Sequence, residues 1–232
     1  MPETGLTRSP KLQKGAIVQL VETFGIPLPN IVPFQFNPAT VSRSLKPWNP
    51  LEVSQTERGL PSPAAQPFDP QETITMEIEL DASDGLEDDD FTAKEFGVAD
   101  RIAALEKMLF PGDSPLGQVL ALASSLLGGG AQAPERRTVP VTFLIWGLGR
   151  IVPVRITTYS IEEQLFLPSL RPLQASIHLS MQVLTPEVFK CLSGPAIELA
   201  RGAYALYRTQ QDALALLNFA NSLDELRALL PF

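Results

Sequence analysis

Leu173-Gln-Ala-Ser-Ile-His-Leu-Ser-Met-Gln-Val183 is the stretch that decides the fold of this 232-residue chain. Apolar residues occupy every second position in it, and polar residues fill the positions between. Because successive side chains of a strand point to opposite faces of a sheet, this alternation predicts a strand with one buried and one solvated face. Residues 74–80, 139–145 and 152–156 alternate in the same way, and Trp146-Gly-Leu-Gly149 predicts a hairpin turn between the last two.

Further strands and one clear helix surround these segments. Shorter strand candidates are residues 15–22, 31–37, 41–45 and 160–165, and Pro153 predicts an edge strand or a bulge. Seven or eight strands at this spacing indicate an antiparallel β-barrel or sandwich. The helix is predicted over residues 99–109, where Val98, Ile102, Leu105 and Leu109 share one face before Pro111-Gly112.

The rest of the chain is less periodic. We expect a long proline-rich loop over residues 47–70, a second apolar helical segment over 116–127 and a connector over 128–134. A helix is predicted to begin at Thr185-Pro186, and the sequence is helical from Pro195. Ser222-Leu-Asp-Glu225 predicts a capping box that opens a last short helix.

These elements predict a mainly β protein of the α+β class, with a flanking helix and an α-helical C-terminal appendage. The domain boundaries that follow are a β domain over residues 1–185, with a helical insertion at about 98–134, and a helical extension over 186–232. If that extension is an interface, the expected contact residues are Tyr204, Tyr207, Phe219 and Phe232.

Composition and charge exclude several functions. The net charge is −8, and residues 67–134 hold fourteen Asp or Glu against three Lys or Arg. Nucleic acids and anionic membranes both attract basic surfaces, so neither is an expected partner. The uncharged run over 115–127 is shorter than the roughly 20 residues that span a bilayer, and the polar N-terminus lacks the apolar core of a secretory signal. We therefore expect no membrane insertion and a protein that is assembled in the cytoplasm.

No set of catalytic or metal-binding residues is apparent. His178 is the single histidine, and its place in a polar row favours a solvent-facing or interface side chain. Cys191, the single cysteine, is interpreted as structural or incidental and excludes a disulfide. The acidic run 81–90 could hold Ca²⁺, but Phe91 stands six residues after Gly85, where a helix-loop-helix calcium site needs glutamate. A solvated loop that leaves a strand explains the run more simply, and electrostatic contact with a basic neighbour is a third possibility. We expect no metal, no cofactor and no enzymatic activity.

Five motifs in order, over about residues 15–185, resemble those of contractile injection system tube and baseplate-adaptor proteins. Phe34-Gln-Phe-Asn-Pro-Ala-Thr-Val-Ser-Arg43 resembles the family's FQFNP signature, which is followed by Ser-Arg. Residues 74–84 resemble its strand with an acidic LDASD end, and residues 98–109 resemble its helix. Val141-Thr-Phe-Leu-Ile-Trp-Gly147 resembles its P-V-x-F-x-W-G strand, and residues 160–184 resemble its closing hairpin. The motif residues that the resemblance implicates in assembly are Phe34, Gln35, Phe36, Asn37, Pro38, Ser42, Arg43, Trp146, Gly147, Phe166, Pro168 and Pro172.

The resemblance implies a tail-tube fold that assembles as a ring, expected to be a hexamer, in a phage-tail-like particle. The implied function is a structural baseplate subunit that connects the central spike hub to the inner tube and initiates tube assembly. The implied partners are further copies of the chain, the hub trimer, the inner tube protein and other baseplate or sheath-initiator proteins. The particle is either released or anchored in a membrane. Residues 47–70 and 98–134 are the segments expected to reach neighbouring subunits.

Two alternatives stay open at this point. The first is the inner tube protein of the same particle. The second belongs to another class, a stand-alone β-sandwich binding module or a hydrolase that uses the acidic run 81–90. Longer members of the family carry a LysM module, whereas the last 45 residues here are predicted to be helical, so glycan binding is not expected.

Overall fold

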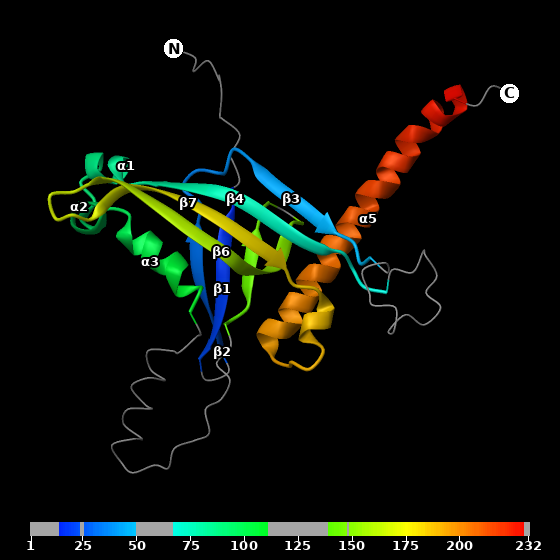
Figure 1. Cartoon of the computed structure of the whole chain (residues 1–232), viewed down its shortest axis with the longest axis horizontal. Helices are drawn as coiled ribbons and strands as arrows, with labels where there is room; N and C mark the ends of the chain where they lie inside the picture. Colours follow the sequence, from blue (N-terminus) through cyan, green and yellow to red (C-terminus); the bar gives the residue numbers. More distant parts are fainter. Residues whose placement is uncertain (1–13, 24–25, 50–66, 111–138, 148, 230–232) are drawn as a thin grey trace, which may run out of the picture.

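The computed structural model of the chain describes residues 14–23, 26–49, 67–110, 139–147 and 149–229. The strands in these residues form one seven-stranded antiparallel sheet with the order β2-β1-β5-β6-β7-β4-β3 (Figure 1). They are β1 (Ala16–Thr23), β2 (Ile26–Pro33), β3 (Val41–Lys46), β4 (Gln71–Asp81), β5 (Thr142–Ile145), β6 (Ile151–Phe166) and β7 (Pro172–Val183). The prediction of a mainly β, α+β protein is confirmed, and these strands form a single sheet rather than the two packed sheets of a sandwich.

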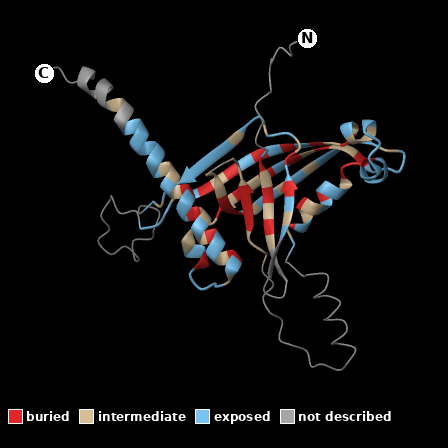
Figure 2. Cartoon of the chain, turned by 180° about the vertical axis from the view of Figure 1, so that it is seen from behind, coloured by how far each residue is buried: buried red, intermediate tan, exposed pale blue. Residues whose placement is uncertain are grey.

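Strand β7 lies between β6 and β4 and has the predicted alternation. Its residues Ile177 and Leu179 are buried and pair with the buried Ile78 and Met76 of β4. The polar residues between them face the other side of the sheet, where His178 is exposed. Buried and exposed segments therefore alternate along these strands in Figure 2. One face of the sheet carries the core and the other meets solvent.

The sheet is strongly curved, which follows from its connections. Strands β2 and β3 are consecutive in the chain but lie at opposite edges, joined by residues 34–40. Eight Cα steps from Pro33 to Val41 reach at most about 28 Å. Six strand spacings of about 4.8 Å would put the edges of a flat sheet about 29 Å apart. The link also bends at residues 35, 36 and 39, so it is shorter than that limit, and the sheet must curl to bring its edges together.

Helices α1 (Ser83–Glu87), α2 (Phe91–Phe96) and α3 (Ala99–Lys107) follow β4. Helix α3 confirms the helix predicted over residues 99–109, and its apolar face lies in the main core. The side-chain amide of Gln19 in β1 donates to the Met108 carbonyl at 3.0 Å, and the side-chain amide of Asn30 in β2 donates to the Ala104 carbonyl at 3.2 Å. Because the last carbonyls of a helix lack partners within it, these two amides fix the end of α3 against the sheet.

Strand β6 is one element of 16 residues, where the sequence predicts two short strands over 152–156 and 160–165. A register shift between Ile156 and Thr158 explains the difference. An irregularity of this kind changes the phase of the alternation, so a single period of two does not run through the strand. The first residues of β6, 151–154, pair with β5, and residues 154–166 pair with β7.

The prediction of an edge or a bulge at Pro153 is wrong. Pro153 is buried inside β6, opposite Phe143 of β5. Its carbonyl accepts a hydrogen bond from the Leu184 amide at 2.9 Å, one residue beyond the end of β7. Since the N–H and C=O of a residue in a strand point to the same side, the N–H that proline lacks would face the end of that ladder, where its loss costs little.

Strand β2 begins five residues before the predicted strand 31–37 and ends at Pro33. Residues 34–37 leave the sheet instead of extending it. Its prolines Pro27, Pro29 and Pro33 are compatible with a strand because β2 is at the edge and pairs with β1 alone among the described strands. The predicted helix over 116–127, the connector over 128–134 and residues 50–66 of the predicted loop lie outside the described residues.

The C-terminal part of the chain is a short 3₁₀ helix, η1 (Pro186–Phe189), followed by helix α5 (Pro195–Leu229) of 35 residues. Proline at the start of η1 is as predicted, although Thr185 forms no side-chain cap. The prediction of a separate last helix is wrong, because the Ser222 hydroxyl donates to the Asn218 carbonyl at 2.8 Å within one continuous helix. The first turns of α5 pack on the sheet, and the rest projects away from it, on the side opposite the β6–β7 hairpin tip (Figure 1).

Candidate assembly surfaces

Residues 34–38, which carry the FQFNP motif, are built into one end of the curled sheet. The Phe34 side chain is only 1% exposed, and its ring centroid lies 6.1 Å from that of Trp146, with the planes tilted by 52°. Gly15 lies against both rings, since a Cβ there would be 2.6 Å from Phe34 Cδ2 and 2.9 Å from the Trp146 ring. Two predicted motif residues that are more than 100 positions apart therefore meet, and a glycine allows their contact.

The polar motif residues tie the same link to three elements. Gln35 Oε1 accepts hydrogen bonds from the Asp81 amide of β4 at 3.0 Å and from Arg101 Nη1 of α3 at 2.5 Å. Asn37 Oδ1 accepts from the Gly15 amide at 2.9 Å. These bonds hold the link across the end of the sheet, so Gln35 and Asn37 stabilise the fold of the chain itself.

The remaining residues of this first motif lie nearer the surface. Phe36 is 46% exposed, and Pro38 is half-buried. Ser42 is exposed on β3, where it pairs with Thr75 of β4. These three residues are available to a neighbouring molecule, in contrast to Phe34.

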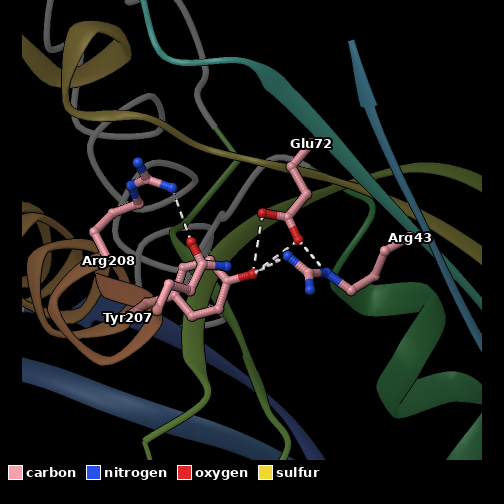
Figure 3. Close-up of polar contacts among 5 residues, drawn as sticks. Arg43, Glu72, Tyr207 and Arg208 are labelled. Carbon is pink, nitrogen blue, oxygen red and sulfur yellow. Dashed lines mark hydrogen bonds and ion pairs between the residues drawn. The ribbon is translucent and has the colours of Figure 1, made fainter. Parts of the chain in front are cut away.

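Arg43 joins β3 and β4 to the base of α5, as Figure 3 shows. Its Nε lies 2.6 Å from Glu72 Oε1 in an ion pair, and its Nη2 donates to Tyr207 Oη at 2.6 Å. The Tyr207 hydroxyl also lies 2.9 Å from Glu72 Oε1, and Glu72 is only 6% exposed. The Arg43 guanidinium carbon lies 5.9 Å from the centroid of the Tyr207 ring. Arg43, Glu72 and Tyr207 thus form a polar triad that connects sheet and helix, in which Glu72 and Tyr207 are buried and Arg43 is partly exposed.

The triad fixes the protonation of two of its members. The hydrogen bond to Glu72 raises the pKa of Arg43, although burial opposes this. Burial raises the pKa of Tyr207, and its hydrogen bond to Glu72 adds to that shift. Both shifts keep the guanidinium charged and the phenol protonated, so the triad is suited to holding α5 in place rather than to transferring protons.

The sequence-based prediction did not include Glu72 and Asp69, which bond the two buried tyrosines of α5. A usable signal exists for Glu72, which occupies the same alternating row as Ile74 and Met76 and is therefore a charge on a buried face. Asp69 Oδ2 accepts a hydrogen bond from the Tyr204 hydroxyl at 2.8 Å. Asp69 precedes the strand, and the sequence contains no comparable signal for it.

The prediction that Tyr204 and Tyr207 contact a partner is wrong. They are 7% and 3% exposed and belong to the core of their own chain. Phe219 is 58% exposed, as a contact residue should be, and Phe232 lies outside the described residues. Near the start of α5, Arg201 Nη2 also donates to the Phe189 carbonyl at 2.5 Å, which ties the helix to η1.

The turn between β5 and β6 confirms the predicted hairpin at residues 146–149. The Trp146 amide donates to the Arg150 carbonyl at 2.9 Å, and Gly147 and Gly149 have φ values of +78° and +83°. Residues other than glycine rarely adopt such φ angles. The side chain of Gln210 in α5 lies directly against Gly149, so this turn also supports the helix.

The β6–β7 hairpin has a fixed base and an apolar tip. The Pro172 carbonyl accepts a hydrogen bond from the Val98 amide at 3.0 Å, and Pro172 is buried. Pro168 is exposed, as is Phe166, at 54%. Leu170 at the tip is 82% exposed. The predicted motif residue Pro172 thus supports the hairpin, whereas Phe166 and Pro168 lie on its accessible surface.

Residues 209–229 are the projecting part of α5, and we call them the arm. Its residues 214–219 form the second exposed apolar surface. Its exposed large apolar side chains are Leu214 at 58%, Leu216 at 69%, Leu217 at 62% and Phe219 at 58%. The stretch from Thr209 to Leu223 contains one charged residue, Asp212. A helix of this composition is normally covered by other protein.

The acidic run is more ordered than the predicted loop, since it forms α1 and caps α2. The Asp90 side chain accepts from the Thr92 amide at 3.2 Å, and Asp89 lies 2.6 Å from Lys94. Burial alone would raise the pKa of Asp81, but hydrogen bonds from Ser83 and Gln174 lower it below its usual value. In the described part of the chain, no group of three His, Cys, Asp or Glu side chains is placed to hold a metal ion.

The structure places the other sequence candidates, His178 and Cys191, at the surface. His178 Nε2 lies 3.5 Å from Glu77 Oε1, and both side chains are about half exposed on the polar face. Cys191 is exposed and unpaired. Two hollows of about 560 and 670 Å³ flank η1. Arg155, which lines both, is the one charged residue among the described lining of the smaller hollow.

No protein-family model matches the chain, and no curated protein matches it. None of the described helices is long and apolar enough to cross a membrane. The function is therefore inferred from the fold, the motif contacts and the exposed apolar surfaces.

Proposed function

We propose that this protein is a structural subunit of the baseplate of a contractile injection system. Copies of it form a ring that connects the spike hub to the inner tube and initiates tube assembly. The observation that carries the proposal is that residues from different family-like motifs, far apart in the sequence, contact one another in the folded chain. Phe34 and Trp146 pack together over Gly15, and the Pro172 carbonyl accepts a hydrogen bond from the backbone amide of Val98, the residue before α3.

The curled sheet suits the proposed tail-tube-like barrel. Its core face is closed by α3, and its other face is polar, as a wall that borders water needs to be. Its two edge strands differ, because β2 carries three prolines and β3 carries none. Proline protects an edge from further pairing, so β3 is the better edge for contact with a neighbouring subunit.

The distribution of exposed apolar residues also favours an assembly subunit. Leu170 marks the hairpin tip at one end of the molecule, and Leu216 marks the arm at the other. Large apolar side chains gathered at such extensions are unfavourable in water and mark surfaces that bind other proteins. A subunit with extensions on opposite sides can contact two different neighbours at once, which a connector between hub and tube requires.

The proposal is tested by purifying particles from the producing cells and quantifying this chain relative to the inner tube protein by mass spectrometry. A small, constant copy number per particle, with antibody label at one end, is the expected result. A copy number that grows with tube length would assign the chain to the inner tube instead. Particles that lack the chain altogether would refute the proposal.

A further inference from the structure

The tip of the β6–β7 hairpin places an exposed apolar side chain on an unfavourable backbone. The Leu170 amide donates to the Leu167 carbonyl at 2.8 Å, and the Leu167 amide donates to the Arg171 carbonyl at 2.9 Å. These bonds close a three-residue loop, whose last residue is usually a glycine in the left-handed conformation. Here that residue is Leu170, with a φ of +62°. The side chain of a leucine disfavours this φ, and Leu170 is largely exposed to solvent as well.

Two more residues with left-handed backbone lie at the same end of the molecule. Among the described residues other than glycine, Leu165, Leu170 and Asp89 are the ones with positive φ. Leu165, in β6 next to the tip, has a φ of +49° and is 60% exposed. Backbone strain of this kind persists mainly where it serves a function. Neither leucine belongs to the core, which indicates that their side chains contact another molecule.

Helices α1 and α2 flank this tip (Figure 1). The guanidinium carbon of Arg171 lies 4.4 Å from the centroid of the Phe96 ring of α2. Gly97, which caps the end of α2, is packed so closely on the Pro172 carbonyl that a Cβ there would collide with it. The helices and the hairpin therefore form one surface, to which Phe96 and Phe166 add exposed apolar area.

This surface is strongly acidic. Residues 83–96 and 162–171 together contain eight Asp or Glu and two Lys or Arg, a net charge of −6 against −8 for the whole chain. Glu87 and Asp88 at the end of α1 and Glu163 in β6 are exposed. Like charges that face each other across an interface are unfavourable, so a protein that covers this surface needs basic side chains.

We propose that the hairpin tip inserts Leu165, Phe166 and Leu170 into an apolar pocket of a different protein, and that Lys and Arg side chains surround this pocket. Charge complementarity with the acidic surface beside the tip selects this occupant. A second copy of this chain has a net charge of −8 and is repelled here, as are nucleic acids and anionic membranes. The inference rests on the proposed function, in which the tip is one of two extensions that contact neighbours in the baseplate.

Photocross-linking of the full chain inside the producing cells tests the docking. The photoreactive residue p-benzoylphenylalanine replaces Ser169, which is exposed at the tip, and mass spectrometry identifies the cross-linked segment. We expect one dominant product with another protein, in a segment where Lys and Arg outnumber Asp and Glu. No product, a product with a second copy of this chain, or a segment in which basic residues are not in excess would overturn the docking.

The role of charge is tested in the same cross-linking chain with the double variant Glu87→Lys, Asp88→Lys. The control is Glu187→Lys, Glu198→Lys, which makes the same change of charge at exposed positions of η1 and α5. We expect the first variant to lower the cross-linking yield at least about tenfold and the control to leave it unchanged. Equal yields from the two variants would count against a basic partner.

The role of the apolar tip is tested with Leu170→Asn. Asparagine tolerates the left-handed conformation better than leucine, so the urea midpoint of the variant should be at least as high as that of the wild type. Its cross-linking yield should nevertheless fall at least about tenfold, whereas Leu192→Asn, in the exposed loop before α5, should leave the yield unchanged. Undiminished cross-linking of Leu170→Asn, or a lower urea midpoint, would show that Leu170 is not an anchor for a partner.

Incorporation into particles is scored separately, because cross-linking in whole cells does not depend on it. A chain that enters particles without the tip cross-link would refute the docking and leave the proposed function intact. A chain that cross-links as expected but is absent from particles would refute the function and leave the docking intact.

Discussion

Replacing Arg43 with methionine should strongly destabilise the protein, because it leaves the carboxylate of Glu72 buried without its cation. Glu72 is 6% exposed, and Arg43 Nε lies 2.6 Å from its Oε1. Removing one partner of a fully buried ion pair costs roughly 3–5 kcal/mol. The Arg43 side chain is 32% exposed and Tyr207 still donates to Glu72, so we expect a smaller loss of about 2–3 kcal/mol.

The free energy of unfolding is measured by urea denaturation followed by the fluorescence of the two tryptophans, Trp48 and Trp146. The control is Lys190→Met, which breaks an exposed pair with Glu187 at 3.7 Å. Exposed pairs contribute little, so this change should cost no more than about 0.5 kcal/mol. A second comparison is the double variant Arg43→Met, Glu72→Leu, which removes both charges and should recover part of the loss.

Equal denaturation midpoints for Arg43→Met and Lys190→Met would refute this account of the triad. So would a double variant that is less stable than Arg43→Met alone, because the cost would then come from lost packing rather than from an unpaired charge.

Four further substitutions test other features. Gly15→Ala should lower stability by about 1–3 kcal/mol in urea denaturation because its Cβ would clash with Phe34, whereas Gly202→Ala, in open space, should raise it by up to about 1 kcal/mol. Tyr159→Phe should raise stability by about 1 kcal/mol, because the Tyr159 hydroxyl is buried with no hydrogen-bond partner among the described residues. Burial raises the pKa of Tyr159 from 10.0 to about 12. The stability of the wild type should therefore fall as the pH rises from 10 to about 12, and the stability of Tyr159→Phe should fall less. Equal losses would contradict this. Hydrogen bonds lower the pKa of the Asp81 carboxyl below 3.8, although burial opposes this shift. The wild type should therefore be more stable than Asp81→Asn above pH 3.8, and this difference should vanish as the pH falls through the pKa of Asp81 in the folded protein. A difference in unfolding free energy that persists in acid would contradict this reasoning.

Strict alternation made most of the sheet predictable. Residues 74–80 and 173–183 are adjacent strands, β4 and β7, with the predicted faces buried. Helix α3 was equally accessible to prediction, because Ile102 and Leu105 recur at helical spacing. Local periodicity succeeds in these elements because each buries one continuous face.

Prediction failed where a distant partner decides the local structure. Pro153 is tolerated inside β6 because β7 ends opposite it, and that depends on the register of two other elements. Tyr204 and Tyr207 resemble interface aromatics in the sequence, yet they are buried in the core, where their hydroxyls bond Asp69 and Glu72, 135 residues earlier in the chain. Helix α5 has no periodic signal that separates its docked section from its projecting section, so the point where it leaves the sheet could not be located from the sequence.

The position of β7 in the middle of the sheet determines when the fold can form during synthesis. Among the described strands, β7 is the last to leave the ribosome, and it is the one that pairs both with β4 of the β3–β4 pair and with β6 of the group β2, β1, β5 and β6. Until residue 183 is available, the nascent chain holds two separate sheet fragments, and β4 and β6 each have an unpaired edge. Such edges invite wrong association, and pairings between distant segments form slowly. A cell that produces many copies at once therefore has reason to keep these chains apart until each has been completed.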